Sequence, residues 1–179
     1  MAHKEQRDFC EFVKHLFPNM FEKKIVLDCG SLDINGNNRY LFEKCSYTGI
    51  DIVAGKNVNV VNHVHKLDYY DNIFNVIIST EMLEHDKHYE LSLKKMVQML
   101  SLEGLLILAC GTTIGDIQRQ EHGTINRLPE CSPGTTDYYK NITEQDIREA
   151  IDIDEIFSNY EFIINTTTCD LYFWGVKKC

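Results

Sequence analysis

The sequence predicts an α/β fold in which a doubly wound, mostly parallel sheet ends in an antiparallel hairpin. Short apolar strands alternate with helical segments up to about residue 110, the order that is typical of a parallel sheet. These strands are continuously apolar, which indicates burial on both faces. Two further runs, 160–165 and 170–176, are separated by a short polar segment and predict the hairpin. The sheet would then have seven strands.

The individual elements follow from local patterns along the chain. Apolar residues recur at helical spacing over 3–17, and Pro18 ends that helix. Strands are expected at 24–29, 47–52, 58–61, 74–79 and 104–110, and helices at 37–45, 88–100 and 144–151. Thr143 caps the last helix, and Asp146 forms an imperfect capping box with it.

Residues 111–141 interrupt this regular pattern. They are rich in Gly, Thr, Pro and charged residues, and a connection of this length inside a compact domain is usually functional or mobile. A chain of 179 residues fits one domain. We therefore expect a single domain over 1–179, with an N-terminal helical segment over 1–20 and a long loop that contributes to a substrate site.

The composition narrows the classes of partner. Apolar residues make up 44% and charged residues 25% of the chain, as in ordinary globular proteins. The net charge of −9 disfavours binding to nucleic acid by charge. Seven cysteines without a C-x-x-C pair indicate free thiols in a reducing compartment. Without a secretory signal or a membrane-spanning apolar run, we expect a cytoplasmic protein with no membrane partner.

A glycine turn follows the first predicted strand. Asp28 and Gly30 end that strand, and Gly36 follows in the same loop. Glycine allows a sharp turn and a close approach of the backbone to a ligand, although a plain strand-to-helix turn would look the same. Asp51 ends the second strand, where in dinucleotide-type folds a carboxylate accepts hydrogen bonds from ribose hydroxyls. A surface aspartate at a strand end remains the simpler alternative.

Two common nucleotide-binding motifs are missing from this loop. Leu32 and Asn35 occupy the second and third glycine positions of G-x-G-x-x-G, which argues against a dehydrogenase. The phosphate-binding pattern G-x-x-x-x-G-K-[ST] does not occur either. A ribose-containing cofactor other than a nicotinamide dinucleotide is therefore favoured.

Three ordered motifs give the sequence a specific resemblance. They are VLDCGSLDING at 26–36, YTGID at 47–51 and FNVIISTEMLEH at 74–85. In this order they resemble the class I S-adenosylmethionine-dependent methyltransferases, which have a Rossmann-like fold. LEGLLIL at 102–108 resembles the entry to the fifth strand of that family. The likeness covers about 22–112 in detail, and it looks closest to the small, type-11-like enzymes of phage and bacterial surface-modification loci.

The resemblance implies S-adenosylmethionine as cofactor and assigns roles along the loop and the strand ends. The cofactor loop, from Asp28 to Gly36, would face the methionine part through Gly30, Ser31 and Leu32. Asp51 would hold the ribose, and Ile52 would pack on the adenine. The implied contacts are completed by Val64 and His65 at the adenine edge and by Thr80 and Glu81 under the methionyl end.

The acceptor side of the site is less specific. His122 in the long loop is a candidate general base, and Arg127, Tyr138 and Tyr139 are candidate substrate contacts. An exposed loop histidine, and tyrosines that only dock the loop, are the simpler alternatives. Two histidine pairs, His63 with His65 and His85 with His88, lack a third ligand at a telling spacing. We therefore predict no metal.

The predicted function is methyl transfer to an oxygen or nitrogen of a small molecule or a sugar. Two alternatives remain. The chain could be an inactive cofactor-binding or scaffold relative, since Leu32 stands where many relatives have a glycine. It could also methylate nucleic acid, although Ser79-Thr80-Glu81-Met82 stands where the amino-directed DNA enzymes carry Asn/Asp-Pro-Pro-Tyr/Phe.

Overall fold

The computed structural model describes residues 3–115, 117–118 and 138–179. The α-helices are α1 (Lys4–Leu16), α2 (Tyr89–Met99), α3 (Glu144–Ala150) and α4 (Ile153–Ile156). Short 3-10 helices are η1 (Pro18–Met20), η2 (Arg39–Leu41), η3 (Val64–Lys66) and η4 (Leu83–His85). The strands are β1 (Ile25–Cys29), β2 (Ser46–Asp51), β3 (Val60–Val61), β4 (Phe74–Thr80), β5 (Leu100–Gly111), β6 (Thr113–Ile114), β7 (Ile117–Gln118), β8 (Phe157–Asn165) and β9 (Asp170–Lys177).

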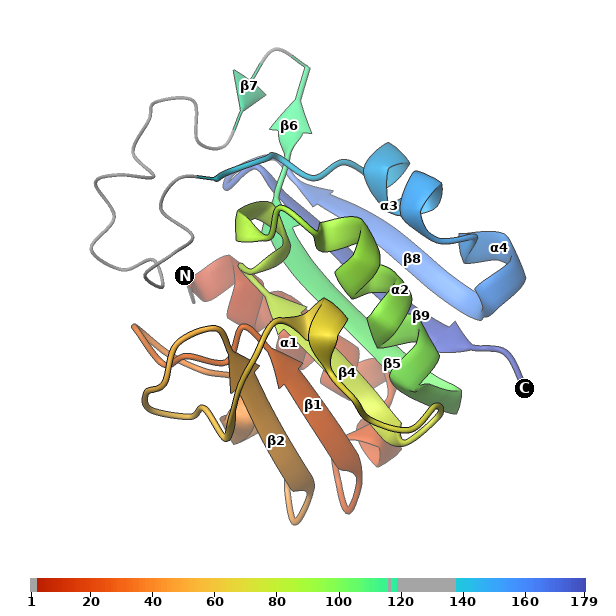
Figure 1. The fold of residues 1–179 in the computed structure, drawn as a ribbon. Helices are drawn as coiled ribbons and strands as arrows, with labels where there is room; N and C mark the ends of the chain where they lie inside the picture. The colour runs from red at the N-terminus through yellow and green to blue at the C-terminus, as the bar shows by residue number, and fades with distance from the viewer. Residues whose placement is uncertain (1–2, 116, 119–137) are drawn as a thin grey trace.

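The main sheet has seven strands in the order β3-β2-β1-β4-β5-β9-β8 (Figure 1). The strands from β3 to β5 pair in parallel, whereas β9 pairs antiparallel with both β5 and β8. The short strands β6 and β7 form a separate hairpin directly after β5. The predicted fold class is confirmed, including the antiparallel hairpin at the C-terminal end.

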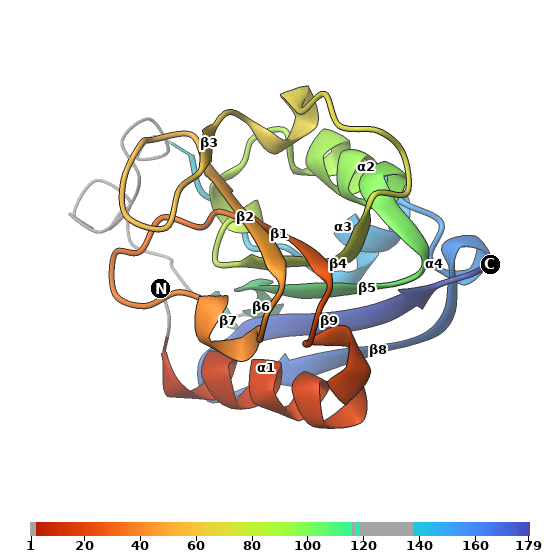
Figure 2. The same ribbon diagram turned by 90° about the horizontal axis from the view of Figure 1, so that it is seen from below.

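Helices cover both faces of the sheet, with α1 on one side and α2 and α3 on the other (Figure 2). The ring of Phe9 in α1 stacks on Tyr172 of β9 with centroids 4.5 Å apart. On the opposite face, Leu93 of α2 and Ile147 of α3 pack in one cluster with Leu106 of β5. Successive residues of the central strands alternate between these two cores, which explains why the strands are apolar throughout.

The prediction of a helix over 37–45 is wrong, because the structure has only the 3-10 turn η2 there. Asn37 and Asn38 use their side chains in local contacts that compete with a helix. The Asn37 Oδ1 atom accepts from the Arg39 amide at 3.0 Å, and Asn38 bonds to neighbouring strands. The backbone is already extended at Phe42 and has a positive φ of 54° at Lys44. The connection from β1 to β2 is therefore a folded loop.

Other element boundaries differ by a few residues. The strand predicted at 58–61 pairs only at Val60 and Val61, and β5 begins at Leu100, four residues before the predicted start. The capping box of α3 is complete, since the Thr143 side chain accepts from the Asp146 amide and the Asp146 side chain accepts from the Thr143 amide. Among the described residues, no helix has both the length and the apolar character needed to cross a bilayer.

Candidate cofactor and acceptor site

The predicted cofactor residues gather at one edge of the sheet. Strands β1, β2, β4 and β5 are parallel, so their carboxyl ends lie side by side (Figure 1). Cys29 at the end of β1 pairs with Ile50 on one side and Ser79 on the other. This carboxyl edge is where ligands bind in doubly wound sheets. We therefore take it as the candidate site.

Gly30 makes the turn at the end of β1. Its φ is +79°, and the amides of Gly30 and Ser31 both donate to the Ile50 carbonyl, at 3.0 and 2.9 Å. A Cβ atom at position 30 would lie 2.6 Å from the Cβ of Met82, which follows β4. The turn thus needs glycine for its backbone angle and for the close approach of the segment after β4.

The rest of the cofactor loop is held against the loop that follows β2. Ser31 and Asn57 exchange two hydrogen bonds, from Ser31 Oγ to the Asn57 carbonyl and from Asn57 Nδ2 to the Ser31 carbonyl. Asp33 pairs with Lys56 at 2.6 Å and accepts from the Gly36 amide at 2.9 Å. Sequence reasoning missed Asn57, because no motif marks a residue that only meets the cofactor loop in space.

Leu32 packs at the same junction. A Cβ atom added at Gly55 would lie 2.3 Å from Leu32 Cδ1, so the leucine side chain rests directly on that glycine. Leu32, which stands at a glycine position according to the resemblance, is therefore accommodated by a glycine in the facing loop.

Asp51 is the residue predicted to hold the ribose. It is buried at the end of β2 and accepts from the Leu32 amide at 3.3 Å and from the Val53 amide at 3.1 Å. A carboxylate can accept about four hydrogen bonds, so these backbone contacts are compatible with ribose hydroxyls as further donors. The structure thereby joins Asp51 to the cofactor loop.

Asp28 is the most buried acidic residue of this loop, with 1% of its surface exposed. Tyr47 donates its hydroxyl to Oδ2, and Asn38 Nδ2 donates to Oδ1 at 3.3 Å. Burial raises the pKa of Asp28 to about 6, while the Tyr47 and Asn38 hydrogen bonds and the nearby Arg39 charge oppose that rise. The carboxylate is therefore close to its titration point near neutral pH.

The residues predicted for the adenine side divide between core and surface. The Val64 side chain belongs to the buried core, whereas Ile52 and His65 are half-buried. The His65 ring lies 4.6 Å from the His88 ring and 5.3 Å from that of His63, measured between centroids. Burial lowers the pKa of His65, which favours a neutral imidazole at this position.

Thr80 is the last residue of β4, and Glu81 follows it at the carboxyl edge. The Thr80 hydroxyl accepts from Asn38 Nδ2 at 3.0 Å, and the Glu81 amide donates to the Ala109 carbonyl at 2.8 Å. His3, Glu81 and Asp170 each have one atom that could ligate a metal ion, and these three atoms lie within 4.8 Å of one another. His3 Nε2 also forms an ion pair with Asp170 at 2.8 Å. This pair connects α1 to the start of β9. The prediction of no metal considered only the histidine pairs and stays a prediction.

The end of the long loop is anchored beside this edge. The Lys140 amide donates to the Glu84 carbonyl at 2.8 Å, and the Ile142 amide donates to the Gly111 carbonyl at 2.8 Å. The Tyr139 ring meets the His85 ring edge-on with centroids 5.1 Å apart. Tyr138 is half-buried nearby, and burial raises its pKa. His122 and Arg127, the other candidate acceptor residues, lie outside the described residues.

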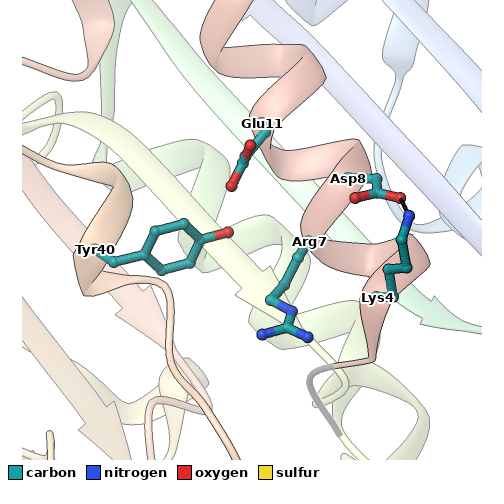
Figure 3. Close-up of a pocket in the computed structure, with 5 residues that line it drawn as sticks. All are labelled: Lys4, Arg7, Asp8, Glu11 and Tyr40. Carbon is teal, nitrogen blue, oxygen red and sulfur yellow. Dashed lines mark hydrogen bonds and ion pairs between the residues drawn. The ribbon is translucent and has the colours of Figure 1, made fainter.

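A separate surface pocket of 290 Å³ lies between α1 and η2. Its lining residues are Lys4, Arg7, Asp8, Glu11 and Tyr40 (Figure 3). The two cationic and two anionic side chains balance in charge, and Lys4 is paired with Asp8. Figure 3 shows the Arg7 guanidinium and the Tyr40 hydroxyl directed toward the same space. None of these residues belongs to the three motifs, so the candidate site remains at the carboxyl edge.

A family model described as a methyltransferase domain matches residues 1–115. The chain belongs to this methyltransferase family. The expected recognition as a class I S-adenosylmethionine-dependent methyltransferase is thereby confirmed, and S-adenosylmethionine is the cofactor of that family. No curated protein is significantly similar to the chain in sequence.

Several solved structures have a similar fold. The 1,6-didemethyltoxoflavin N1-methyltransferase of Burkholderia thailandensis has a TM-score of 0.68 and 14% identity, over 98% of this chain and 79% of that one. The phosphoethanolamine N-methyltransferase 2 of Haemonchus contortus has a TM-score of 0.68 and 13% identity, and the match covers 97% of this chain but 53% of that one. The YcgJ protein of Bacillus subtilis has a TM-score of 0.61 and 11% identity, and the match covers 94% of this chain and 99% of that one. At these identities the likeness shows the fold.

Proposed function

We propose that the chain transfers a methyl group from S-adenosylmethionine to an oxygen or nitrogen of a small-molecule acceptor. One observation carries this proposal: the three separate motifs meet at the carboxyl edge. Gly30 bonds to Ile50 and approaches Met82, while Leu32 donates to Asp51. The cofactor loop is thus built from contacts among the segments that the family uses to bind its methyl donor.

Methyl transfer from a sulfonium needs no covalent intermediate with the protein. The acceptor lone pair attacks the methyl carbon in line, the carbon–sulfur bond breaks, and its electron pair returns to sulfur. An acceptor that carries a proton on the attacking atom releases it to a base or to solvent. The enzyme therefore has mainly to align donor and acceptor and to exclude water. The donor carries a sulfonium and an ammonium group, and the carboxylates of Asp28, Asp51 and Glu81 at the edge suit a cationic ligand.

Calorimetric titration with S-adenosylmethionine tests the proposal. We expect binding of one molecule per chain, and Asp51→Asn should weaken the affinity about tenfold, because one acceptor for the ribose hydroxyls is lost. Asp71→Asn is the matched control, since Asp71 is exposed in the turn before β4, at the opposite edge of the sheet. Absence of binding to the unaltered chain would favour the inactive scaffold.

We infer that the long loop forms part of the binding site for the methyl acceptor. Tyr139 packs on His85 of the motif after β4, so the loop ends beside the cofactor segments. The neighbour from B. thailandensis holds 1,6-didemethyltoxoflavin, and the one from H. contortus is named for phosphoethanolamine. Both are small molecules. These relatives support a small-molecule acceptor over a nucleic acid, in agreement with the net charge of −9.

Exchange of residues 111–141 for the corresponding loop of a relative tests this assignment. We expect the acceptor preference to change while the dissociation constant for S-adenosylmethionine stays within about twofold, because the residues predicted to bind the cofactor lie outside 111–141. Formation of S-adenosylhomocysteine over a panel of amine and hydroxyl acceptors is the measurement. Lost cofactor binding with unchanged acceptor preference would contradict the assignment.

A further inference from the structure

Asn38 occupies a buried position between three segments of the candidate site. It follows the cofactor loop, and 6% of its surface is exposed. Its side-chain amide donates to Asp28 Oδ1 on β1 at 3.3 Å and to Thr80 Oγ1 at the end of β4 at 3.0 Å. A single amide group thus uses both of its N–H donors on two strand ends of the carboxyl edge.

The same carboxylate is held from the other side by β2. Tyr47 donates its hydroxyl to Asp28 Oδ2, and the Arg39 guanidinium lies 4.2 Å from the centroid of the Tyr47 ring. Burial raises the pKa of Tyr47 far above its usual value, so this hydroxyl stays a donor. Both Asp28 oxygens therefore accept hydrogen bonds from neutral groups that favour the ionised form.

We propose that Asn38 is a positioning residue for methyl-donor binding, which holds the Asp28 carboxylate ionised and fixed against the end of β4. This inference rests on the proposed function, because it takes Asp28 as the anionic partner of a cationic donor. Asn38 is assigned no contact with the donor itself. Its effect runs through the charge of Asp28, so it has a signature in pH that a packing role lacks.

The groups around Asp28 determine the expected titration. Arg39 and Asp51 act on it with opposite sign, the first lowering and the second raising its pKa. Cys10 of α1 also faces it, and burial raises the pKa of that thiol to about 12, so the thiol is neutral. Burial places the pKa of Asp28 itself at about 6. Donor affinity should therefore fall below neutral pH as Asp28 is protonated.

The fall in donor affinity below neutral pH forms the acid limb of the pH profile. Loss of the Asn38 amide should move this acid limb to higher pH. A hydrogen bond to a charged group corresponds to about one pH unit. With a limb near 6, Asn38→Ala would weaken S-adenosylmethionine binding about fivefold at pH 6 but by only about a tenth at pH 8. Asn38→Asp, which keeps the shape and adds a like charge, should shift the limb further in the same direction.

The test is calorimetric titration of the full chain with S-adenosylmethionine at several pH values between 5 and 8. Asn37→Ala is the matched control, because the neighbouring amide bonds to Asp33 instead of Asp28. It should leave the position of the limb unchanged. Since the ligand is the same throughout, differences between variants report on the protein.

Each outcome decides between the two proposals. A limb that shifts in Asn38→Ala and Asn38→Asp but not in Asn37→Ala supports the positioning role. An affinity loss that is equal at every pH would make Asn38 a packing residue and overturn the inference, with the proposed function intact. Absence of donor binding to the unaltered chain would overturn both. Circular dichroism of Asn38→Asp separates these results from a failure to fold.

Discussion

Replacement of Gly30 with alanine is expected to destabilise the protein by about 3 kcal/mol and to weaken S-adenosylmethionine binding tenfold or more. The backbone of Gly30 has a φ of +79°, which costs an L-residue about 1–2 kcal/mol. The added methyl group would also lie 2.6 Å from Met82 Cβ, an atom fixed directly to the backbone. Relief of this overlap requires a shift of the loop or of the segment after β4.

Gly115 provides a matched control for Gly30. Its φ is also positive, at +58°, but a Cβ atom there would meet nothing within 4 Å among the described residues. Gly115→Ala should therefore cost only the backbone strain, about 1 kcal/mol, and should not affect donor binding. Urea unfolding and calorimetry measure the two effects. Equal destabilisation by both substitutions would show that the contact with Met82 is unimportant.

The order of elements could be predicted from the sequence because each pattern is local. Continuous apolar strands such as Ile25–Cys29 and Phe74–Thr80 predicted burial on both faces, and the structure places their residues alternately in two cores. The prediction of a helix at 37–45 was wrong because of tertiary contacts. The Asn38 side-chain amide donates hydrogen bonds to Asp28 and Thr80. Helix propensity does not include such contacts with distant residues.

The candidate site could be predicted only where a motif marks it. Gly30 and Asp51 belong to sequence motifs, and the structure brings them together through Leu32, whose amide donates to Asp51. Asn38 lies outside the three motifs, and Tyr47 begins the second motif without a predicted role, because the roles of both side chains depend on meeting Asp28 in space. The acceptor residues are not readable for a chemical reason: in-line displacement sets distances and alignment, which many residue types can provide.

Replacement of Asp170 with alanine should lower the free energy of unfolding by about 3 kcal/mol, the cost of breaking a buried ionic and hydrogen-bonded cluster. Asp170 is fully buried at the start of β9. Its Oδ2 atom pairs with His3 Nε2 at 2.8 Å and accepts from Thr168 Oγ1 at 2.6 Å and from the Tyr172 hydroxyl at 3.0 Å. Alanine would leave these donors inside the protein without their acceptor.

Asp154 serves as the control for Asp170. Its side chain is 75% exposed, although it pairs with Arg148 at 3.6 Å. Exposed ion pairs contribute little, so Asp154→Ala should change the stability by no more than about 0.5 kcal/mol. Urea unfolding of both variants gives the comparison. A small effect of Asp170→Ala would mean that solvent reaches the cluster and replaces the lost acceptor.

The charge of His3 adds a pH dependence to this cluster. The hydrogen bond and charge of Asp170, together with the charge of Glu81, raise the pKa of His3 despite partial burial. A raised pKa means that the folded protein favours the protonated imidazole, so this contribution is complete below the unfolded pKa of about 6.5 and is lost as the pH rises through the folded pKa. The stability difference between the unaltered chain and His3→Ala should therefore shrink from pH 6 to pH 9. A difference that is constant over this range would mean that the imidazole acts through packing alone, since packing does not titrate.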